Sequence, residues 1–358
     1  MENVVMDKNF WNNKKVFITG HTGFKGSWLT LSLIQMGAII MGFSEKTHGK
    51  KTIYESCNID QDIKSIQGNI NDIEYLTSSM QAFEPEIVFH LAAQPLVIHS
   101  YLNPIETYDV NVMGTLRVLE AIKNTKSIKA SILITTDKCY ENKELERGYH
   151  EDDRLGGHDP YSSSKACAEI LIRSYRDSYH NELSSGISSA RAGNVIGGGD
   201  FAKDRLITDM IESFITKKAI IIRKPNSIRP WQHVLDPLAG YMNLAQKMYA
   251  SNDHKYSGPW NFGPDEESAK TVEWMISHAC ELWGDGATWS LANELTTTPH
   301  ETTELRLDSS KSKKLLDWEP KWGVDKALSE TLKWYQMQIK EADMRSFTMQ
   351  QISEYNYD

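Results

Sequence analysis

Residues 16–26 have the sequence Val-Phe-Ile-Thr-Gly-His-Thr-Gly-Phe-Lys-Gly, in which a short apolar run enters a turn with three regularly spaced glycines. Apolar residues over 27–36 predict a helix that Gly37 closes, and residues 38–43 predict a second buried strand. This order forms a βαβ unit, in which glycines let the backbone approach a pyrophosphate. A tight turn that binds nothing is the alternative, and the βαβ context disfavours it. The predicted cofactor contacts in the turn are Gly20, Thr22, Gly23, Phe24, Lys25 and Gly26.

The alternation of strands and helices continues along the chain. Residues 87–91 and 131–134 predict two more buried strands, with a helical pattern over 110–124 between them. The order predicts an α/β fold, a Rossmann-type doubly wound parallel sheet with a smaller C-terminal α/β substrate domain. The expected division is a dinucleotide-binding domain at 1–195 with later segments near 230–262 returning to it, an interleaved substrate domain mainly at 196–340, and a peripheral tail at 341–358.

The composition disfavours several classes of protein. The net charge of −9 argues against nucleic-acid binding, because that requires a basic face. The four cysteines lack CxxC spacing, so we expect no metal site, and free thiols suit a reducing compartment. No apolar run reaches the ~18 residues of a membrane span, and the first residues lack the apolar core of a secretory signal. We expect a cytoplasmic protein without nucleic-acid or membrane partners.

The end of the second strand bears on which dinucleotide is accepted. An acidic residue there would hold the ribose of the adenosine and disfavour a 2′-phosphate. This chain has Ser44 at that position, followed by Glu45 and Lys46. Ser44 is therefore a predicted cofactor contact, and NAD and NADP both stay open.

Tyr161 and Lys165 are spaced i, i+4, which on a helix places them on one face. A free tyrosine has a pKa near ~10, too high for an efficient base at neutral pH. A neighbouring ammonium and the positive nicotinamide ring would favour the phenolate, so Lys165 is predicted to lower the pKa of Tyr161. A core tyrosine beside a surface lysine is the alternative, which the upstream glycine turn disfavours.

Thr136, Asp137 and Lys138 directly follow the strand at 131–134. Ligands of doubly wound sheets bind outside the carboxyl ends of the strands, so these side chains are expected at the same site as Tyr161. A polar exit from strand to loop is the alternative. With Tyr161 downstream, the three residues indicate further acid and base groups, beyond those that a simple oxidation requires.

These motifs together resemble the extended short-chain dehydrogenase/reductase family. They are Thr19-Gly-His-Thr-Gly-Phe-Lys-Gly26, His90-Leu-Ala-Ala93, Asn111-Val-Met-Gly-Thr115, Tyr161 with Lys165, and Arg191-Ala-Gly-Asn194. Within that family, Thr136-Asp-Lys138, Arg229-Pro-Trp-Gln-His-Val234 and Trp260-Asn-Phe-Gly-Pro264 resemble the nucleotide-sugar 4,6-dehydratase branch, and in particular its members that act on CDP-linked sugars.

The resemblance implies a catalytic set. Thr136 and Tyr161 contact the 4-hydroxyl of the sugar, Tyr161 is the base and Lys165 tunes it, while NAD stays tightly bound and is recycled. Asp137 is the acid for the departing 6-hydroxyl. Lys138 stands where related TDP-glucose enzymes carry the glutamate that removes the C5 proton. Two roles for Lys138 stay open: it removes that proton, or it positions Asp137 or stabilises the enolate while another group acts.

The resemblance also implies further contacts. For the cofactor they are Asn69, Ile70, Leu91, Ala92, Ala93, Asn111, Tyr161 and Lys165. For the substrate they are Gln94, Thr136, Asn194, Arg205, Arg229, His233, Asn261 and Arg306. Arg229 is the expected phosphate ligand, because a guanidinium grips phosphate bidentately, with a surface ion pair as the alternative. A structural role suits His233 equally well.

The expected function is dehydration of a CDP-sugar in deoxysugar biosynthesis, by a homodimer or homotetramer. A GDP- or TDP-linked 4,6-dehydratase and a nucleotide-sugar 4-epimerase are alternatives on the same scaffold. A non-catalytic nucleotide-binding scaffold protein is the alternative of a different class, and Thr136, Tyr161 and Lys165 argue against it.

Overall fold

The computed structural model of the chain describes residues 7–45, 52–183, 186–251, 254–292 and 305–357. Its centre is a seven-stranded sheet in which every neighbouring pair is parallel. In spatial order the strands are β11 (Gly258–Asn261), β6 (Gly186–Arg191), β5 (Ala130–Ile134), β4 (Ile87–His90), β1 (Lys15–Thr19), β2 (Ile39–Ser44) and β3 (Lys64–Gln67). The predicted Rossmann-type sheet is confirmed.

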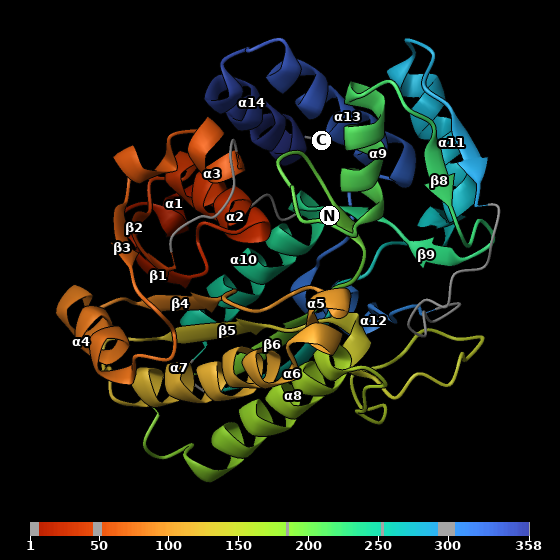
Figure 1. Cartoon of the computed structure of the whole chain (residues 1–358). Helices are drawn as coiled ribbons and strands as arrows, with labels where there is room; N and C mark the ends of the chain where they lie inside the picture. The colour runs from red at the N-terminus through yellow and green to blue at the C-terminus, as the bar shows by residue number, and fades with distance from the viewer. Residues whose placement is uncertain (1–6, 46–51, 184–185, 252–253, 293–304, 358) are drawn as a thin grey trace.

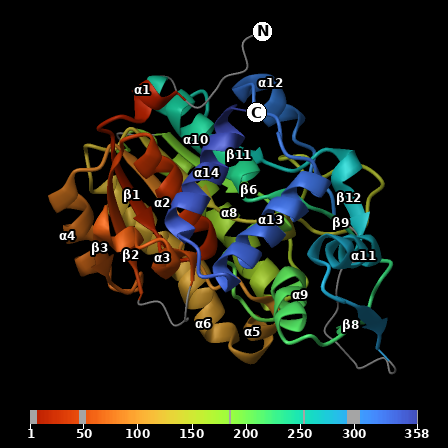
Figure 2. The ribbon, with the colours of Figure 1, turned by 90° about the horizontal axis from the view of Figure 1, so that it is seen from above.

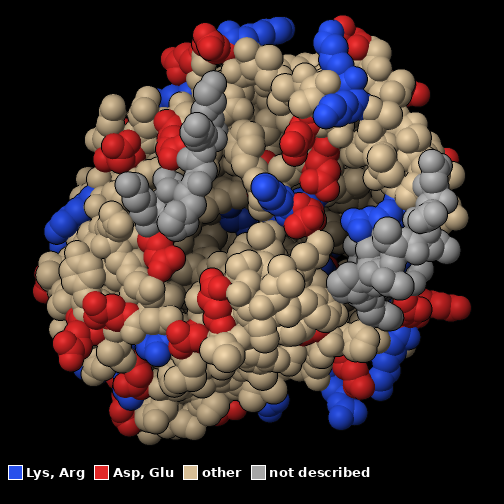
Figure 3. Space-filling view, in the orientation of Figure 1, with Lys and Arg blue, Asp and Glu red and all other residues tan. Residues whose placement is uncertain are grey.

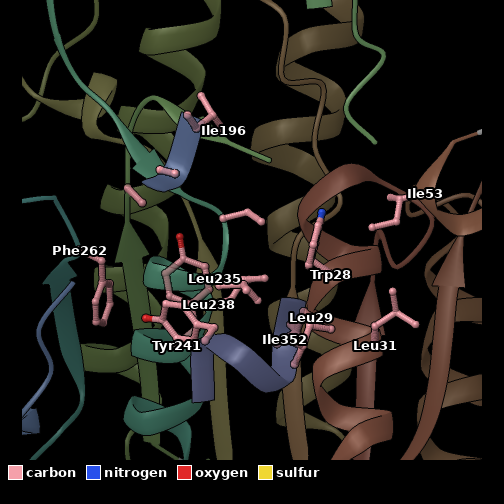
Figure 4. Close-up of a cluster of buried hydrophobic side chains, with 14 of the residues drawn as sticks. Trp28, Leu29, Leu31, Ile53, Ile196, Leu235, Leu238, Tyr241, Phe262 and Ile352 are labelled. Atoms are coloured by element: carbon pink, nitrogen blue, oxygen red, sulfur yellow. The ribbon is translucent and has the colours of Figure 1, made fainter. Parts of the chain in front are cut away.

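Helices cover both faces of this sheet (Figures 1 and 2). On one face lie α2 (Phe24–Gln35), α10 (Leu235–Ala250) and α14 (Met344–Tyr357), and on the other α4 (Ile73–Phe83), α7 (Gly114–Lys123) and α8 (Pro160–Ser178). Side chains of β1 alternate between the two cores, with Val16 and Ile18 in one and Phe17 in the other. Because both faces are buried, the strands are almost continuously apolar in sequence. Figure 4 shows part of the first core, with Trp28, Leu235 and Tyr241.

Short elements complete the frame around the sheet. Shorter helices in the N-terminal half of the chain are α1 (Lys8–Trp11), α3 (Ile53–Ser56), α5 (Val97–Leu102) and α6 (Pro104–Tyr108). A π-helical turn, η2 (Asp109–Met113), joins α6 to α7, and 3-10 turns lie at η1 (Ile59–Gln61), η3 (Asp137–Cys139) and η4 (Glu266–Ser268). The helix predicted over 110–124 therefore begins with a wider turn.

A smaller region beside the sheet consists of short paired strands and helices (Figure 1). β7 (Val195–Ile196) pairs with β10 (Gln232–His233), β8 (Ile220–Ile222) with β13 (Trp289–Leu291), and β9 (Ile228–Pro230) with β12 (Ala269–Thr271). Its helices are α9 (Leu206–Ile215) and α11 (Val272–Trp283), and α12 (Ser310–Leu316) and α13 (Val324–Ile339) follow along the chain. Between β10 and β12 the chain returns to the seven-stranded sheet through α10 and β11.

The C-terminal segment differs from the expected peripheral tail, because α14 docks into the core beside α2 and α13. Its buried residues are Met344, Thr348, Gln351, Ile352 and Tyr355. Their spacing of three or four residues forms one helical face, of which two members are polar. Both polar side chains are hydrogen-bonded internally: Trp334 Nε1 donates to Thr348, and Gln351 Nε2 donates to Glu330, while Gln351 Oε1 is buried without a partner among the described residues. An apolar pattern alone therefore missed this helix.

No helix within the described ranges is both long and apolar enough to cross a membrane. In the same ranges no cluster of three or more His, Cys, Asp or Glu side chains is arranged to hold a metal ion.

Candidate active site

A cleft of about 950 Å³ lies at the carboxyl ends of the central strands and extends to the smaller region. Figure 3 shows the hollow near the middle of the molecule, with charged side chains at its rim. Most predicted site residues line this cleft: Gly20, Thr22, Gly23, Phe24, Lys25, Gly26, Ser44, Asn69, Ile70, Leu91, Ala92, Ala93, Thr136, Asp137, Lys138, Tyr161, Lys165, Asn194, Arg205 and Arg229. Residues far apart in sequence thus meet at one edge of the sheet, as parallel strands require.

The glycine turn is shaped by contacts that admit no side chain. Gly20 has φ +74°, and a Cβ there would lie 2.6 Å from the backbone nitrogen of Ala92. A Cβ on Gly26 would collide with the carbonyl of Gly20. The N-cap of α2 is Gly23, and no side chain caps this end. The first N–H groups of α2 are therefore oriented as donors for an anion such as a pyrophosphate.

The acid that would hold an adenosine ribose lies one residue beyond the predicted position. Ser44 Oγ shares a hydrogen bond of 2.8 Å with Thr22 Oγ1. Glu45 lines the cleft, and Asn69 Nδ2 donates to its Oε1 at 2.7 Å. Glu45 was not among the predicted contacts, although an acid near the end of the second strand was the available signal. A carboxylate at this place favours ribose hydroxyls over a 2′-phosphate.

Thr136 and Asp137 leave β5 toward the cleft. Thr136 Oγ1 donates to Asp137 Oδ1 at 2.9 Å and accepts from the backbone N–H of Lys138 at 3.3 Å. Asp137 is 3% exposed, and a Cβ on Gly193 would collide with its carboxylate. Gly193 therefore leaves the space that Asp137 occupies.

Tyr161 lies in the first turn of α8, where the side chain of Asp159 caps the helix by accepting from Ser162 N–H. Burial raises the pKa of Tyr161 to about 12; its hydrogen bond with Thr136 opposes this, and the carboxylate of Asp137 adds to it. That Lys165, together with the nicotinamide ring, favours the phenolate of Tyr161 stays a prediction. Burial of the phenol dominates, and Thr136 makes the largest opposing contribution.

Two lysines in the cleft have altered pKa values. Burial lowers the pKa of Lys165 to about 8, and its Nζ donates to the carbonyl of Ile134 at 3.3 Å. Desolvation within the cleft and the charge of Arg205 lower the pKa of Lys25 to about 8, whereas Asp137 raises it. Lys25 thus lies within the electrostatic reach of the acid at the catalytic centre, and not only at the cofactor turn.

The far end of the cleft is rich in cations. Arg205 Nη1 forms an ion pair of 2.5 Å with Asp200 Oδ2, and Arg229 extends from β9. Arg223 and Lys224, which sequence analysis did not select, line the same end. They directly follow the apolar strand β8, and two cations at such a strand end were the signal available. The group suits a diphosphate.

Five predicted residues lie outside the lining of the cleft. Gln94 and Asn111 are buried and bond each other: Gln94 N–H donates to Asn111 Oδ1 at 2.9 Å, and Asn111 Nδ2 donates to the Gln94 carbonyl at 3.0 Å. They shape the wall that carries Ala92 and Ala93. The direct contacts predicted for Gln94 with substrate and for Asn111 with cofactor stay predictions, and in this structure the two residues support each other.

His233, Asn261 and Arg306 are the other three. His233 is fully buried between the rings of Trp28 and Trp322. Asn261 Nδ2 donates to the carbonyls of Tyr149 and Asp308, which ties β11 to two loops. The carbonyl of Arg306 accepts from Tyr149 N–H at 2.8 Å. That these three residues contact the substrate stays a prediction, although His233 and Asn261 are used in packing and hydrogen bonding in this structure.

The fold and the cleft define a nucleotide-dependent enzyme of the short-chain dehydrogenase/reductase type, with a Thr/Tyr/Lys centre beside a glycine turn. The family model "GDP-mannose 4,6 dehydratase" matches residues 17–331, and the chain belongs to this family. The resemblance drawn from the sequence motifs is confirmed.

Relatives of known activity include several dehydratases. The CDP-glucose 4,6-dehydratase of Salmonella typhimurium is 49% identical over 98% of both chains. The dTDP-glucose 4,6-dehydratase of Xanthomonas campestris is 21% identical over 89% of this chain and 92% of its own.

Solved structures share the fold. The dTDP-glucose 4,6-dehydratase of Bacillus anthracis in complex with NAD has a TM-score of 0.77 and 23% identity, covering 92% of this chain and 98% of its own. The UDP-glucose 4-epimerase of Thermotoga maritima with UDP-glucose has a TM-score of 0.77 and 20% identity, covering 91% and 99%.

Proposed function

We propose that this protein is an NAD-dependent CDP-glucose 4,6-dehydratase that forms CDP-4-keto-6-deoxy-glucose and water for deoxysugar biosynthesis. The observation that carries the proposal is the 49% identity over 98% of both chains to the Salmonella enzyme. The cleft supports it, because Thr136, Asp137 and Lys138 lie in the same cavity as Tyr161 and Lys165.

NAD fits the cofactor end of the cleft. The uncapped start of α2 offers N–H donors to the pyrophosphate, Gly20 admits close approach, and Glu45 suits ribose hydroxyls. When bound, NAD would supply the hydride chemistry, which is oxidation of the sugar at C4 and reduction at C6. The far cations, Arg205, Arg223, Lys224 and Arg229, would hold the diphosphate of the substrate.

The side chains of the centre divide the proton transfers. Tyr161 removes the proton of the 4-hydroxyl, and Thr136, which already bonds the phenol, orients that hydroxyl. The C4 ketone acidifies the C5 proton. Asp137 donates a proton to the departing 6-hydroxyl, so that water leaves as the C5–C6 double bond forms. Lys138 is proposed to remove the C5 proton and to return a proton to C5 when C6 is reduced.

We further propose a homodimer through α5, α6 and α8, in the cytoplasm. The apolar residues exposed on these helices and the adjoining η2 turn are Ile98, Tyr101, Leu102, Ile105, Met113 and Ile170. Leu102 and Ile105 are 75% and 85% exposed, which a second copy of the chain would cover. The four cysteines form no disulfide, as suits a reducing compartment.

Mass spectrometry of reactions with CDP-, GDP- and TDP-glucose tests the activity. CDP-glucose should be the substrate converted to a product lighter by one water molecule. A 4-epimerase would leave the mass unchanged. Active enzyme that dehydrates GDP- or TDP-glucose but not CDP-glucose would refute the proposed substrate.

A further inference from the structure

Glu169 lies two turns beyond Tyr161 and one turn beyond Lys165 on α8, outside the lining of the cleft and only 4% exposed. We propose that Glu169 is a positioning residue for the dehydration, which holds the Thr136 segment against Tyr161 and Lys165 on the same helix. The inference rests on the proposed function and assigns a role to a residue that the mechanism above does not use.

Both carboxylate oxygens of Glu169 accept hydrogen bonds from the ends of two central strands. Thr135 Oγ1 donates to Oε1 at 2.5 Å. Ser189 Oγ and Arg191 Nη2 donate to Oε2 at 2.8 and 2.7 Å. Thr135 directly precedes Thr136, so the first of these bonds restrains the backbone that presents the catalytic hydroxyl.

Lys165 holds the preceding residue of the same segment, because its Nζ donates to the carbonyl of Ile134. Glu169 and Lys165, on successive turns of α8, thus hydrogen-bond Thr135 and Ile134, two successive residues at the end of β5. Tyr161 lies on the same face of α8. These two hydrogen bonds therefore set the distance between the Tyr161 phenol and Thr136. A misplacement of ~1 Å at such a centre can lower a rate about 10²-fold.

Glu169 also affects the pKa of Lys165. Burial lowers the pKa of Lys165, and the Glu169 carboxylate is the main group that opposes this. The nearby Cys139 thiol stays neutral, because burial raises its pKa. Among the other titratable groups nearby, His90 on β4 is held neutral by burial, and Lys25 at the start of α2 is a base. The Asp137 carboxylate lines the same cleft, but it is not among the main influences on the pKa of Lys165. Without the carboxylate, Lys165 loses its proton at a lower pH.

A purely structural ion pair between Glu169 and Arg191 is the alternative. That pair would account for Oε2 alone and needs neither Thr135 nor Lys165. Arg191 also has other partners, since its Nη1 donates to Tyr140 Oη and to the carbonyl of Glu151. Burial of an ion pair is in itself weak evidence of stabilisation, because desolvation offsets the attraction.

The test compares the pH dependence of kcat/KM for the wild type, Glu169→Gln and Glu169→Asp. In Glu169→Gln the alkaline loss of activity should begin about one pH unit or more lower, with kcat at neutral pH reduced about tenfold and KM changed little. Glu169→Asp should keep the wild-type alkaline limb. Thr135→Val removes one hydrogen bond without a charge, so it should lower kcat and leave the limb in place.

Glu330→Gln is the matched control, because Glu330 is a buried carboxylate on α13 that accepts from Lys333 and Gln351, away from the cleft. The Glu330→Gln variant should change neither kcat nor the pH at which the alkaline loss of activity begins. A folded Glu169→Gln variant with the wild-type limb and kcat overturns the inference. If that variant does not fold, an unchanged kcat in Thr135→Val overturns it. The assay uses whichever of CDP-, GDP- or TDP-glucose the wild type dehydrates, so failure with CDP-glucose refutes the proposed substrate alone.

Discussion

Replacing Asp236 by Asn should remove a pH dependence from the stability of this protein. Asp236 lies in the first turn of α10 and is fully buried. Its Oδ1 accepts from Lys321 N–H at 2.8 Å and from Tyr355 Oη at 3.0 Å. It therefore ties α10 to the loop before α13 and to the C-terminal helix.

Burial raises the pKa of Asp236 from 3.8 to about 7, although its hydrogen bonds to Lys321, Tyr355 and Trp322 oppose the shift. An acid with a raised pKa in the folded state binds its proton more tightly there than in the unfolded chain. The stabilisation that this tighter proton binding gives the folded state is complete below about pH 4. It is lost as the pH rises to about 7. At about 1.36 kcal/mol per pH unit, the two units from pH 5 to pH 7 cost about 2.7 kcal/mol.

Urea unfolding of the wild type and Asp236→Asn at pH 5 and pH 8, at one protein concentration, measures this effect. Groups that titrate in both proteins cancel in the difference. The free energy of unfolding of the Asn variant, relative to the wild type, should rise by about 2.7 kcal/mol between the two pH values. Asp177→Asn at the exposed end of α8 should show no such rise. Equal differences at pH 5 and pH 8 would refute the reasoning.

Three further predictions concern the centre and the glycine turn. Tyr161→Phe should lower the kcat for dehydration about 10²- to 10⁴-fold, and unchanged turnover, followed by product mass, would remove Tyr161 from the base role. Lys138→Ala should block entry of solvent deuterium at C5 while sparing partial reduction of bound NAD, whereas normal exchange would exclude Lys138 as the C5 base. Gly42→Ala should destabilise the fold by about 1–3 kcal/mol in urea, because a Cβ there collides with the buried His21 ring. The added substitution His21→Ala should recover part of that loss, and an additive double mutant would contradict this.

The catalytic segments could be predicted from sequence because their signals are local. The glycine spacing of residues 20–26 has a meaning within one turn, and the i, i+4 spacing of Tyr161 and Lys165 defines one helix face. Thr136 and Asp137 could be assigned because a buried strand ends just before them, and parallel strands present their carboxyl ends at one edge.

Supporting residues could not be separated from contact residues in the same way. Gln94 and Asn261 have side chains that suit a ligand equally well, yet their amides are used by Thr107 and Tyr149, partners that are distant in sequence. Arg223 could not be predicted for the same reason, because its place at the cleft depends on how β8 pairs with the distant strand β13.

By itself the sequence determined the Rossmann-type sheet and the glycine turn, and it predicted the catalytic set, since periodicity and motif spacing act over a few residues. Only the tertiary structure decided that α14 belongs to the core, that burial raises the pKa of Tyr161, and that Glu169 bonds Thr135. Each of these depends on which groups from distant segments enclose a side chain. Desolvation and hydrogen-bond partners are properties of that enclosure, so they arise only when the chain is folded.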